Sequence, residues 1–333
     1  MVILRVAING FGRIGRNTFR ALLNEKKINC VAINDLTDIK TLAYLLKYDS
    51  IHGTFNKTIK IKNNNLIVNN KTIQILSEKD PSKLPWKKLK IDVVIESTGF
   101  FATKKDAEKH LKAGAKKVII SANYKGNQDI KTLINGVNLN TYNKKTDNIL
   151  CKGSCTTTCL TPLVKVLHDN FEIESGFLTT VHAVTTSQRI LDAPHKKLRE
   201  GRSLLNNLIP TTTGAAFAVT RVIPELKGKI DGMAIRVPVQ DGSIVDFTCI
   251  VKKKTTVEEV NEIFKKASEG KFKGIIQYTE EPLTGVDIIG NTHSAIFDSQ
   301  LTKVNNNFIK ILAWYDNEYG YSKNLVDIVK ILC

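Results

Sequence analysis

The stretch Asn9-Gly10-Phe11-Gly12-Arg13-Ile14-Gly15 decides the fold of the N-terminal half. It matches the pattern G-x-G-x-x-G, follows an apolar run from Val2 to Ile8 that predicts a strand, and precedes a helical pattern over Thr18 to Leu23. In that context the first glycine permits a tight turn, the second lets the backbone approach a pyrophosphate, and the third allows close packing of helix on strand. The stretch therefore predicts a dinucleotide-binding turn, with the pyrophosphate at a helix N-terminus.

An acidic residue follows the next strand. Cys30 to Ile33 reads as a β-branched strand, and Asp35 comes just after it. A carboxylate at this place bonds a ribose diol and repels a 2′-phosphate, so the cofactor is predicted to be NAD and not NADP.

The first half alternates strand and helix patterns, which predicts an α/β Rossmann domain with a parallel sheet covered on both faces. Asn56 to Ile75, with its alternation and Asn-rich turns, is interpreted as an antiparallel insertion. The other expected elements are the helices at 39–46 and 104–113 and the strands at 93–96 and 118–121.

The second half has longer alternating segments and predicts an α+β domain with a mostly antiparallel sheet. Its expected strands are 177–184, 230–237, 243–252 and 307–314, and its expected helices are one after Cys155, one at 256–268 and one over the last fifteen residues. The domain boundary is predicted near residue 153, where the pattern changes.

Length and composition limit the function classes. The chain has 333 residues, which favours two domains, and a formal net charge of +17. The excess is lysine spread along the chain with no basic arm, so a nucleic-acid partner is not expected. No apolar stretch is long enough to span a membrane, and no targeting segment is evident, so a cytoplasmic location is expected. The six cysteines lack the spacing of a zinc site, and we expect free thiols and no metal.

Cys155 is the candidate nucleophile. It precedes the helical pattern Leu160 to Leu167, and a helix N-terminus is expected to lower the pKa of a thiol. A nucleophilic cysteine needs a base, and His182, at the end of an alternating strand, is the best candidate of six histidines. Sequence alone leaves that pairing open.

The residues together resemble phosphorylating glyceraldehyde-3-phosphate dehydrogenase over essentially the whole chain. The matches, in order, are Ala7-Ile8-Asn9-Gly10-Phe11-Gly12-Arg13-Ile14-Gly15-Arg16, Leu45-Leu46-Lys47-Tyr48-Asp49-Ser50, Glu96-Ser97-Thr98-Gly99, Ala113-Gly114-Ala115-Lys116-Lys117-Val118, Pro210-Thr211-Thr212-Thr213-Gly214-Ala215-Ala216, Arg236-Val237-Pro238 and Trp314-Tyr315-Asp316-Asn317-Glu318-Tyr319-Gly320-Tyr321-Ser322.

The resemblance implies an NAD-binding domain over residues 1–153, a catalytic domain over 154–316 and a C-terminal helix over 317–333 that returns to the first domain. It implies a homotetramer. It implies that glyceraldehyde 3-phosphate is oxidised, with inorganic phosphate, to 1,3-bisphosphoglycerate through a thioester on Cys155, with His182 as activator. This reaction belongs to glycolysis.

The resemblance also assigns binding roles. The cofactor would be bound by Gly10, Phe11, Gly12, Arg13, Ile14, Gly15, Asp35, Ser121, Asn317 and Tyr321. The two anion sites would be formed by Ser154, Thr156, Thr185, Arg202, Thr213, Gly214 and Arg236. Arginine suits a phosphate because its fork bonds two oxygens at once.

The sequence departs from the family pattern at several positions around these sites. Thr158 replaces a usual Asn, Val184 replaces a Tyr, and Ser187 stands where an Asp is usual. Glu200 and Gly201 interrupt a usual Arg-Arg-Ala-Arg run. These changes bear on the choice of substrate, and the alternative reading is erythrose-4-phosphate dehydrogenase. The intact Pro210 to Gly214 stretch favours a phosphate-using enzyme.

Overall fold

The computed structural model describes residues 3–126 and 130–332, which form two compact units. The first unit contains the described residues within 1–133, 140–153 and 322–333, and the second contains 134–139 and 154–321. Val2, the expected start of the first strand, and Cys333 lie outside the described residues. No helix within 3–126 and 130–332 has the length and apolar character needed to cross a membrane.

The first unit is built on a nine-stranded sheet in the order β3-β4-β5-β2-β1-β6-β7-β9-β8. Its strands are β1 (Leu4–Asn9), β2 (Ile28–Asn34), β3 (Ile59–Lys62), β4 (Asn65–Val68), β5 (Lys71–Leu76), β6 (Val93–Glu96), β7 (Lys117–Ile120), β8 (Lys131–Thr132) and β9 (Ile149–Cys151). All of its pairings are parallel except β3–β4 and β4–β5. The insertion expected at 56–75 is therefore antiparallel within itself, but β5 joins the main sheet by pairing in parallel with β2.

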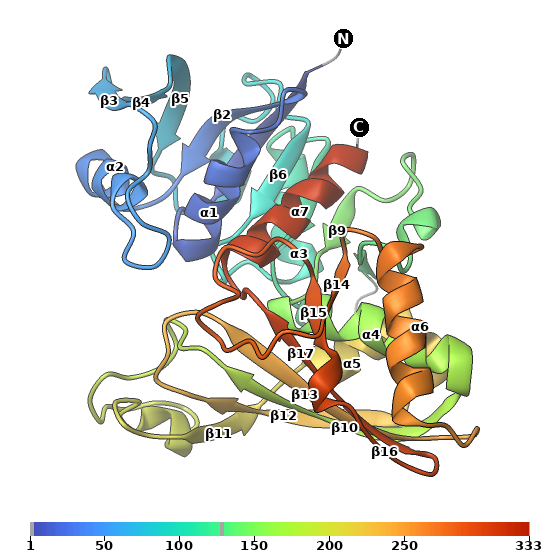
Figure 1. The fold of residues 1–333 in the computed structure, drawn as a ribbon. Helices are drawn as coiled ribbons and strands as arrows, with labels where there is room; N and C mark the ends of the chain where they lie inside the picture. The colour runs from blue at the N-terminus through green and yellow to red at the C-terminus, as the bar shows by residue number, and fades with distance from the viewer. Residues whose placement is uncertain (1–2, 127–129, 333) are drawn as a thin grey trace. The chain divides into compact units, whose positions relative to one another are not determined.

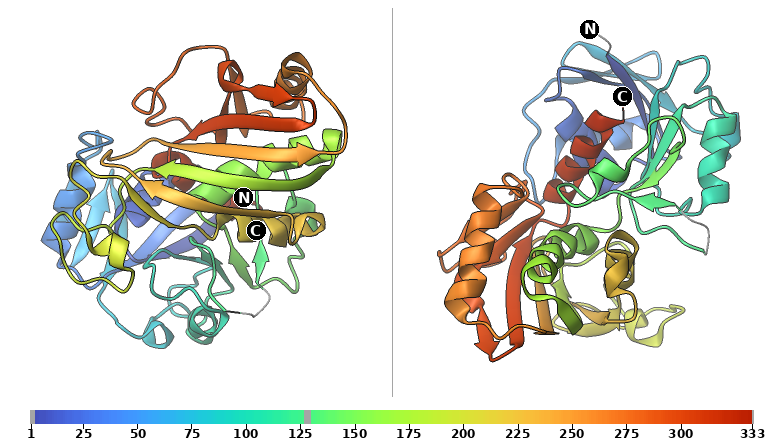
Figure 2. Two further views of the ribbon diagram at one scale, coloured as in Figure 1. Left: turned by 90° about the horizontal axis from the view of Figure 1, so that it is seen from below. Right: turned by 90° about the vertical axis from the view of Figure 1, so that its right-hand side faces the viewer.

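Helices lie on both faces of this sheet, as expected. They are α1 (Arg13–Leu22), α2 (Ile39–Lys47), α3 (Lys104–Lys112) and the Ser322–Ile331 part of α7 (Tyr319–Ile331). Helix α7 lies beside α1 on one face and α3 lies on the other (Figures 1 and 2). Lys323 and Lys330 of α7 both pair with Glu25, at 3.6 and 2.6 Å. Helix α1 starts five residues before the expected Thr18, directly after the glycine turn.

The second unit is built on a sheet in the order β11-β12-β10-β13-β17-β15-β14, with β16 paired to β17. Its strands are β10 (Ile173–His182), β11 (Ile209–Thr212), β12 (Ile230–Arg236), β13 (Ser243–Val251), β14 (Ile276–Thr279), β15 (Ala295–Asp298), β16 (Lys303–Asn305) and β17 (Phe308–Tyr315). Only the β10–β12 and β14–β15 pairs are parallel. The prediction of a mostly antiparallel sheet is confirmed.

Helices cover one face of this sheet and leave the other face open. They are α4 (Cys155–Phe171), α5 (Ala215–Val222) and α6 (Val257–Glu269), and Figure 2 shows the opposite face without a helix. The apolar core lies under the helices, where the rings of Phe264 and Phe297 stack at 3.9 Å between centroids. The strands that carry the site therefore have one rigid, fully packed side. The remaining short helices are 3₁₀ turns: η1 (Pro81–Lys83), η2 (Leu139–Thr141), η3 (Leu198–Gly201), η4 (Pro224–Leu226) and η5 (Ser299–Leu301).

Candidate active site

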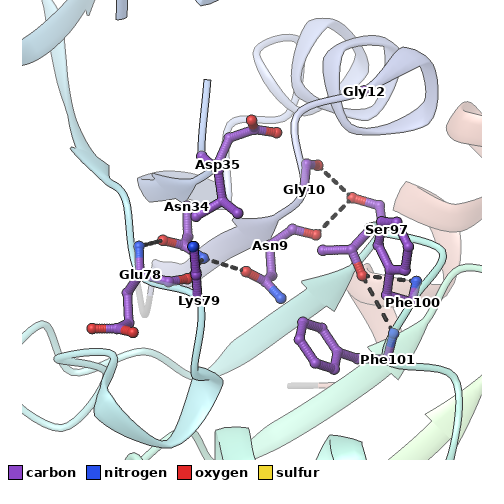
Figure 3. Close-up of a pocket in the computed structure, with 12 residues that line it drawn as sticks. Asn9, Gly10, Gly12, Asn34, Asp35, Glu78, Lys79, Ser97, Phe100 and Phe101 are labelled. Carbon is purple, nitrogen blue, oxygen red and sulfur yellow. Dashed lines mark hydrogen bonds between the residues drawn. The ribbon is translucent and has the colours of Figure 1, made fainter. Parts of the chain in front are cut away.

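The glycine turn between β1 and α1 borders a cavity of about 380 Å³ in the first unit (Figure 3). Gly10 has φ +91°, and a Cβ there would lie 2.6 Å from the backbone nitrogen of Thr98. A Cβ on Gly15 would lie 2.1 Å from the Gly10 carbonyl oxygen, so both positions require glycine. At Gly12 nothing lies within 4 Å of a Cβ position, so its backbone is open toward the cavity that it lines.

Asp35 lines the same cavity at the carboxyl end of β2. Its carboxylate accepts hydrogen bonds from the backbone N–H groups of Phe11, at 2.7 Å, and Thr37, at 2.9 Å. Ser97 Oγ donates to the Gly10 carbonyl at 2.7 Å and fixes the turn from the β6 side (Figure 3). The Asp35 carboxylate therefore lies beside an open backbone turn, which is the arrangement that a dinucleotide requires.

Four other residues predicted for the cofactor support the turn or lie in the same unit. Phe11 is buried and packs edge-on against Phe19, and Arg13 forms a two-pronged ion pair with Asp49, at 2.7 and 3.1 Å. Ser121 follows β7, and its N–H donates to the Glu96 carbonyl at 2.9 Å. Ile14 is half-buried in the first turn of α1.

In the second unit the structure brings Cys155 and His182 together. Cys155 is the first residue of α4 and His182 the last of β10, and Cys155 Sγ lies 3.3 Å from His182 Nε2. Arg236 lies opposite His182 in the parallel β10–β12 register, and its Nη1 contacts His182 Nδ1. The Ala183 carbonyl oxygen lies 2.7 Å from His182 Nδ1 and 3.1 Å from Arg236 Nη1.

The protonation states follow from burial and from the Arg236 charge. Burial and the Arg236 guanidinium lower the pKa of His182 to about 3, so the imidazole is neutral at pH 7. Burial also raises the pKa of the Cys155 thiol, against the opposing charge of Arg236 and the Thr156 N–H. The expectation that the helix N-terminus lowers this pKa is wrong for the free protein, because the cost of burying a thiolate outweighs the helix effect.

Tyr315 is a residue of this site that sequence reasoning did not single out. It is buried, its hydroxyl lies 2.9 Å from the Oγ1 atoms of both Thr156 and Thr180, and its ring packs edge-on to His182. It thereby fastens the start of α4 to β10, the two elements that carry the pair. Its only signal in the sequence was its place in the Trp314 to Ser322 match.

The start of α4 is well capped. Ser154 is the N-cap, and its Oγ accepts from the Thr157 N–H at 3.1 Å. Thr158, one of the departures from the family pattern, is buried and donates its hydroxyl to the Ser154 carbonyl at 2.9 Å. The substitution therefore supports the helix start that presents Cys155.

The residues predicted for phosphate lie on several loops of the second unit. Thr213 and Gly214 stand at the N-terminus of α5, where Thr213 Oγ1 accepts from the Ala215 N–H at 3.2 Å. Thr185 follows β10, and its N–H and hydroxyl donate to Gln188 Oε1 at 2.9 and 2.8 Å. Arg202 is exposed and donates to Asp192 at 3.0 Å.

The two C-terminal residues predicted for the cofactor lie within the second unit. Asn317 Oδ1 accepts from Ser243 Oγ at 2.6 Å, and Ser243 Oγ accepts from the Ala183 N–H at 3.0 Å. This chain links Asn317 to the residue after His182. Tyr321 is buried near the start of α7.

Comparison with known proteins gives matches along nearly the whole chain. The family model "Glyceraldehyde 3-phosphate dehydrogenase, NAD binding domain" matches residues 4–104, and the model of the C-terminal domain of the same family matches 154–317. Glyceraldehyde-3-phosphate dehydrogenase of Geobacillus stearothermophilus is 52% identical over 326 residues, covering 98% of this chain and 97% of its own. The protein of that name from Borreliella burgdorferi is 52% identical over 339 residues, covering 99% of each chain.

Proposed function

This chain belongs to the glyceraldehyde-3-phosphate dehydrogenase family, and we propose that it oxidises glyceraldehyde 3-phosphate with NAD and inorganic phosphate to 1,3-bisphosphoglycerate in glycolysis. The observation that carries the proposal is the Cys155–His182 contact at 3.3 Å, held at a helix start and a strand end. A thiol beside a neutral imidazole is the arrangement that nucleophilic acyl chemistry needs.

The neutral pair sets the direction of proton movement. We assign the imidazole proton to Nδ1, which lies 2.7 Å from the Ala183 carbonyl oxygen, so that Nε2 of His182 is unprotonated and faces the thiol. His182 then takes the Cys155 proton as sulfur attacks the aldehyde carbon, and a thiohemiacetal forms. Bound NAD supplies the acceptor for the hydride that leaves this carbon. The thioester left on Cys155 is attacked by inorganic phosphate, which releases the acyl phosphate and returns the thiol.

The oxygen of the thiohemiacetal needs donors during these steps. We assign this role to the backbone N–H of Cys155, at the first turn of α4, and to the protonated His182 side chain. Thr185 and Arg236 would hold the phosphate of the substrate. Ser154, Thr156, Thr213 and Gly214 would hold inorganic phosphate at the N-termini of α4 and α5, with Arg202 between the two anions.

The residues of the first unit fit NAD. Gly12 is open toward the cavity, and Asp35 presents a carboxylate at the end of β2. Gly10 to Gly15 would hold the pyrophosphate and Asp35 the adenosine ribose, with Ser121, Asn317 and Tyr321 assigned to the cofactor by family position. We accordingly assign residues 1–153 to NAD binding, 154–316 to catalysis and 317–333 to a helix that returns to the first domain.

We infer a homotetramer, as the family resemblance implies, and assign the open face of the second sheet to one interface between its subunits. Its exposed outward side chains include Phe177, Met233, Ile250 and Phe308, and the register places them on one face of four adjacent strands. Exposed apolar side chains gathered on one face are typical of an interface between subunits. A sedimentation experiment should give about four times the 37.1 kDa of one chain, and Met233→Lys should lower it. A monomer at micromolar concentration would contradict the inference.

We infer a cytoplasmic location. No disulfide joins the cysteines within the described residues, which fits a reducing compartment. Fractionation of the native host would test this, and recovery with the membrane or the medium would contradict it.

The function itself is tested by following NADH absorbance with glyceraldehyde 3-phosphate. The wild type should form NADH rapidly only when inorganic phosphate is present, and Cys155→Ser should abolish turnover while retaining NAD binding. A higher kcat/KM for erythrose 4-phosphate, or NADH formation independent of phosphate, would replace the proposed reaction.

A further inference from the structure

A buried carboxylate lies in the loop that connects β10 to β11. Most of this loop is exposed, including Ile190 at 61% and Leu198 at 88%, but Glu200 and Gln188 are each only 7% exposed. The loop closes on itself, since the Leu204 N–H donates to Arg189 and the Ala193 N–H donates to Gly201. The two buried polar side chains therefore have fixed surroundings inside an otherwise open segment.

Gln188 connects Glu200 to the proposed substrate-phosphate residue. Its Oε1 accepts both the N–H and the hydroxyl of Thr185, at 2.9 and 2.8 Å. Its Nε2 donates to Ser187 Oγ at 3.0 Å and to Glu200 Oε2 at 3.4 Å. Ser187 and Glu200, two of the departures from the family pattern, thus both accept hydrogen bonds from the Gln188 amide group.

Glu200 connects onward to the strand that leads to the proposed inorganic-phosphate residues. Its Oε1 accepts from Thr211 Oγ1 at 2.5 Å and pairs with Lys197 Nζ at 3.1 Å. Lys197 Nζ also donates to Thr212 Oγ1 at 2.7 Å. Thr211 and Thr212 end β11, directly before Thr213 and Gly214.

The carboxylate is ionised at neutral pH. Burial opposes ionisation, but the Thr211 hydroxyl and the Lys197 ammonium lower the pKa of Glu200 below its usual value. An ionised carboxylate only accepts hydrogen bonds, so every neighbour must donate to it. This fixes the orientation of the Gln188 amide, with Nε2 toward Glu200 and Oε1 toward Thr185.

We propose that Glu200 is a positioning residue that ties the Thr185 loop to the end of β11, so that the two anion sites keep one fixed separation. This inference rests on the proposed function. Inorganic phosphate must reach the thioester carbon on Cys155 while the substrate's own phosphate holds that acyl group in place, and a misplacement of about 1 Å costs on the order of 100-fold in rate. A single carboxylate bonded on both sides is a short and rigid link between the two loops.

Exchanging the carboxylate and the amide between Glu200 and Gln188 tests the proposed connection between the two loops. Gln188→Glu places a second carboxylate against Glu200 and should lower kcat/KM for glyceraldehyde 3-phosphate by on the order of 10-fold or more. Glu200→Gln alone should have a smaller effect, because an amide still accepts from one side. The double variant Gln188→Glu/Glu200→Gln reverses donor and acceptor, since the introduced carboxylate accepts from Thr185 and from the introduced amide. It should recover activity to within about threefold of the wild type.

The readouts separate positioning from a general loss of structure. At saturating inorganic phosphate, kcat/KM for unphosphorylated glyceraldehyde and the KM for NAD should change little across the series. The thermal shift given by subsaturating inorganic phosphate, which needs no turnover, should follow the same pattern of loss and recovery. Gln188→Ala should not be rescued by Glu200→Gln. Glu262→Gln, which removes an exposed carboxylate paired with Lys266, is the matched control.

The outcomes are distinct. A wild type that does not oxidise glyceraldehyde 3-phosphate refutes the proposed function, and the phosphate-dependent thermal shift then still decides the link. A double variant no better than Gln188→Glu, or equal losses for both aldehydes, overturns the positioning role of Glu200.

Discussion

Removing the positive charge of Arg236 should slow alkylation of Cys155. Arg236 Nη1 contacts Nδ1 of His182, and Nε2 of the same ring lies 3.3 Å from the sulfur. Adding the width of the imidazole ring to these two contacts puts the guanidinium roughly 8 Å from the sulfur. At an effective dielectric constant of about 20, a unit charge at that distance stabilises the thiolate by about 2 kcal/mol. That is about 30-fold in thiolate fraction, and water around the half-buried Arg236 reduces it to about 10-fold.

The assay is the rate of carbamidomethylation of the Cys155 peptide in Arg236→Gln and wild type at pH 7.5, followed by mass spectrometry. Iodoacetamide is uncharged, so the charge of the variant does not change its local concentration. Burial, the larger cause of the low pKa of His182, remains in the variant and keeps the imidazole neutral. The rate should fall about 10-fold, since only the thiolate reacts.

Two controls bound this result. Arg236→Lys keeps the charge and should restore most of the rate, and Arg221→Gln, which removes a charge on α5, should leave it unchanged. Burial raises the pKa of both Cys30 and Cys249 to about 12, so neither should compete for the reagent. A rate for Arg236→Gln within twofold of the wild type would show that Arg236 does not set the ionisation of the thiol.

Three further predictions concern other parts of the molecule. Asp35→Asn keeps an acceptor for the Phe11 N–H but loses the charge, so kcat/KM for NADP relative to NAD should rise on the order of 10-fold; an unchanged ratio would remove Asp35 from cofactor choice. The pKa of His182 is lower in the folded than in the unfolded state, so protonation of this side chain favours unfolding. The free energy of unfolding should therefore be unaffected by protonation of His182 above about pH 6.5 and should fall as the pH drops toward about 3. Wild type should therefore lose about 2 kcal/mol more than His182→Asn between pH 7 and 5 in urea unfolding, and parallel pH profiles would contradict this. Ser187→Asp gives Thr185 and Gln188 a stronger acceptor, so kcat/KM should rise for glyceraldehyde 3-phosphate and barely change for glyceraldehyde, and an equal change for both would refute it.

The secondary structure was predictable where the pattern of one segment determines it. The helix expected from Thr256 is found, with Thr256 as its N-cap in a capping box with Glu259. Strand β10 begins at Ile173, four residues before the expected start, because Gly176 interrupts the alternation. Its missing side chain leaves room for Phe247, whose ring would lie 2.9 Å from a Cβ. Strand β11 was not among the expected strands. It contains Pro210, which is tolerated because β11 is an edge strand.

The sequence was enough to identify residues of the candidate site, but it did not show which of them are in contact. The nucleophile and the glycine turn carry local signals, a helix start and a spacing of glycines. The contact of Cys155 with His182 depends on α4 packing against a sheet, and the place of Arg236 depends on the parallel register of β10 and β12. Glu200 stands out in the sequence as a departure, but its surroundings depend on the fold, which brings both Thr211 and Lys197 to its Oε1. These are properties of the folded chain that no single segment encodes.

The wrong expectation for the thiol shows which effect dominates. A helix N-terminus stabilises a nearby anion by about 0.3–1 kcal/mol, and by at most about 2 kcal/mol when partly buried. Full burial moves the pKa of an acidic group by up to about 3–5 units, which corresponds to about 4–7 kcal/mol. Cys155 lies at a helix start and is partly exposed, yet desolvation is still the larger effect, so its pKa rises. A cysteine at a helix start therefore indicates the position of a nucleophile in the sequence. Its ionisation depends on the charges that the tertiary fold brings near it, here Arg236 on the other side of the His182 ring.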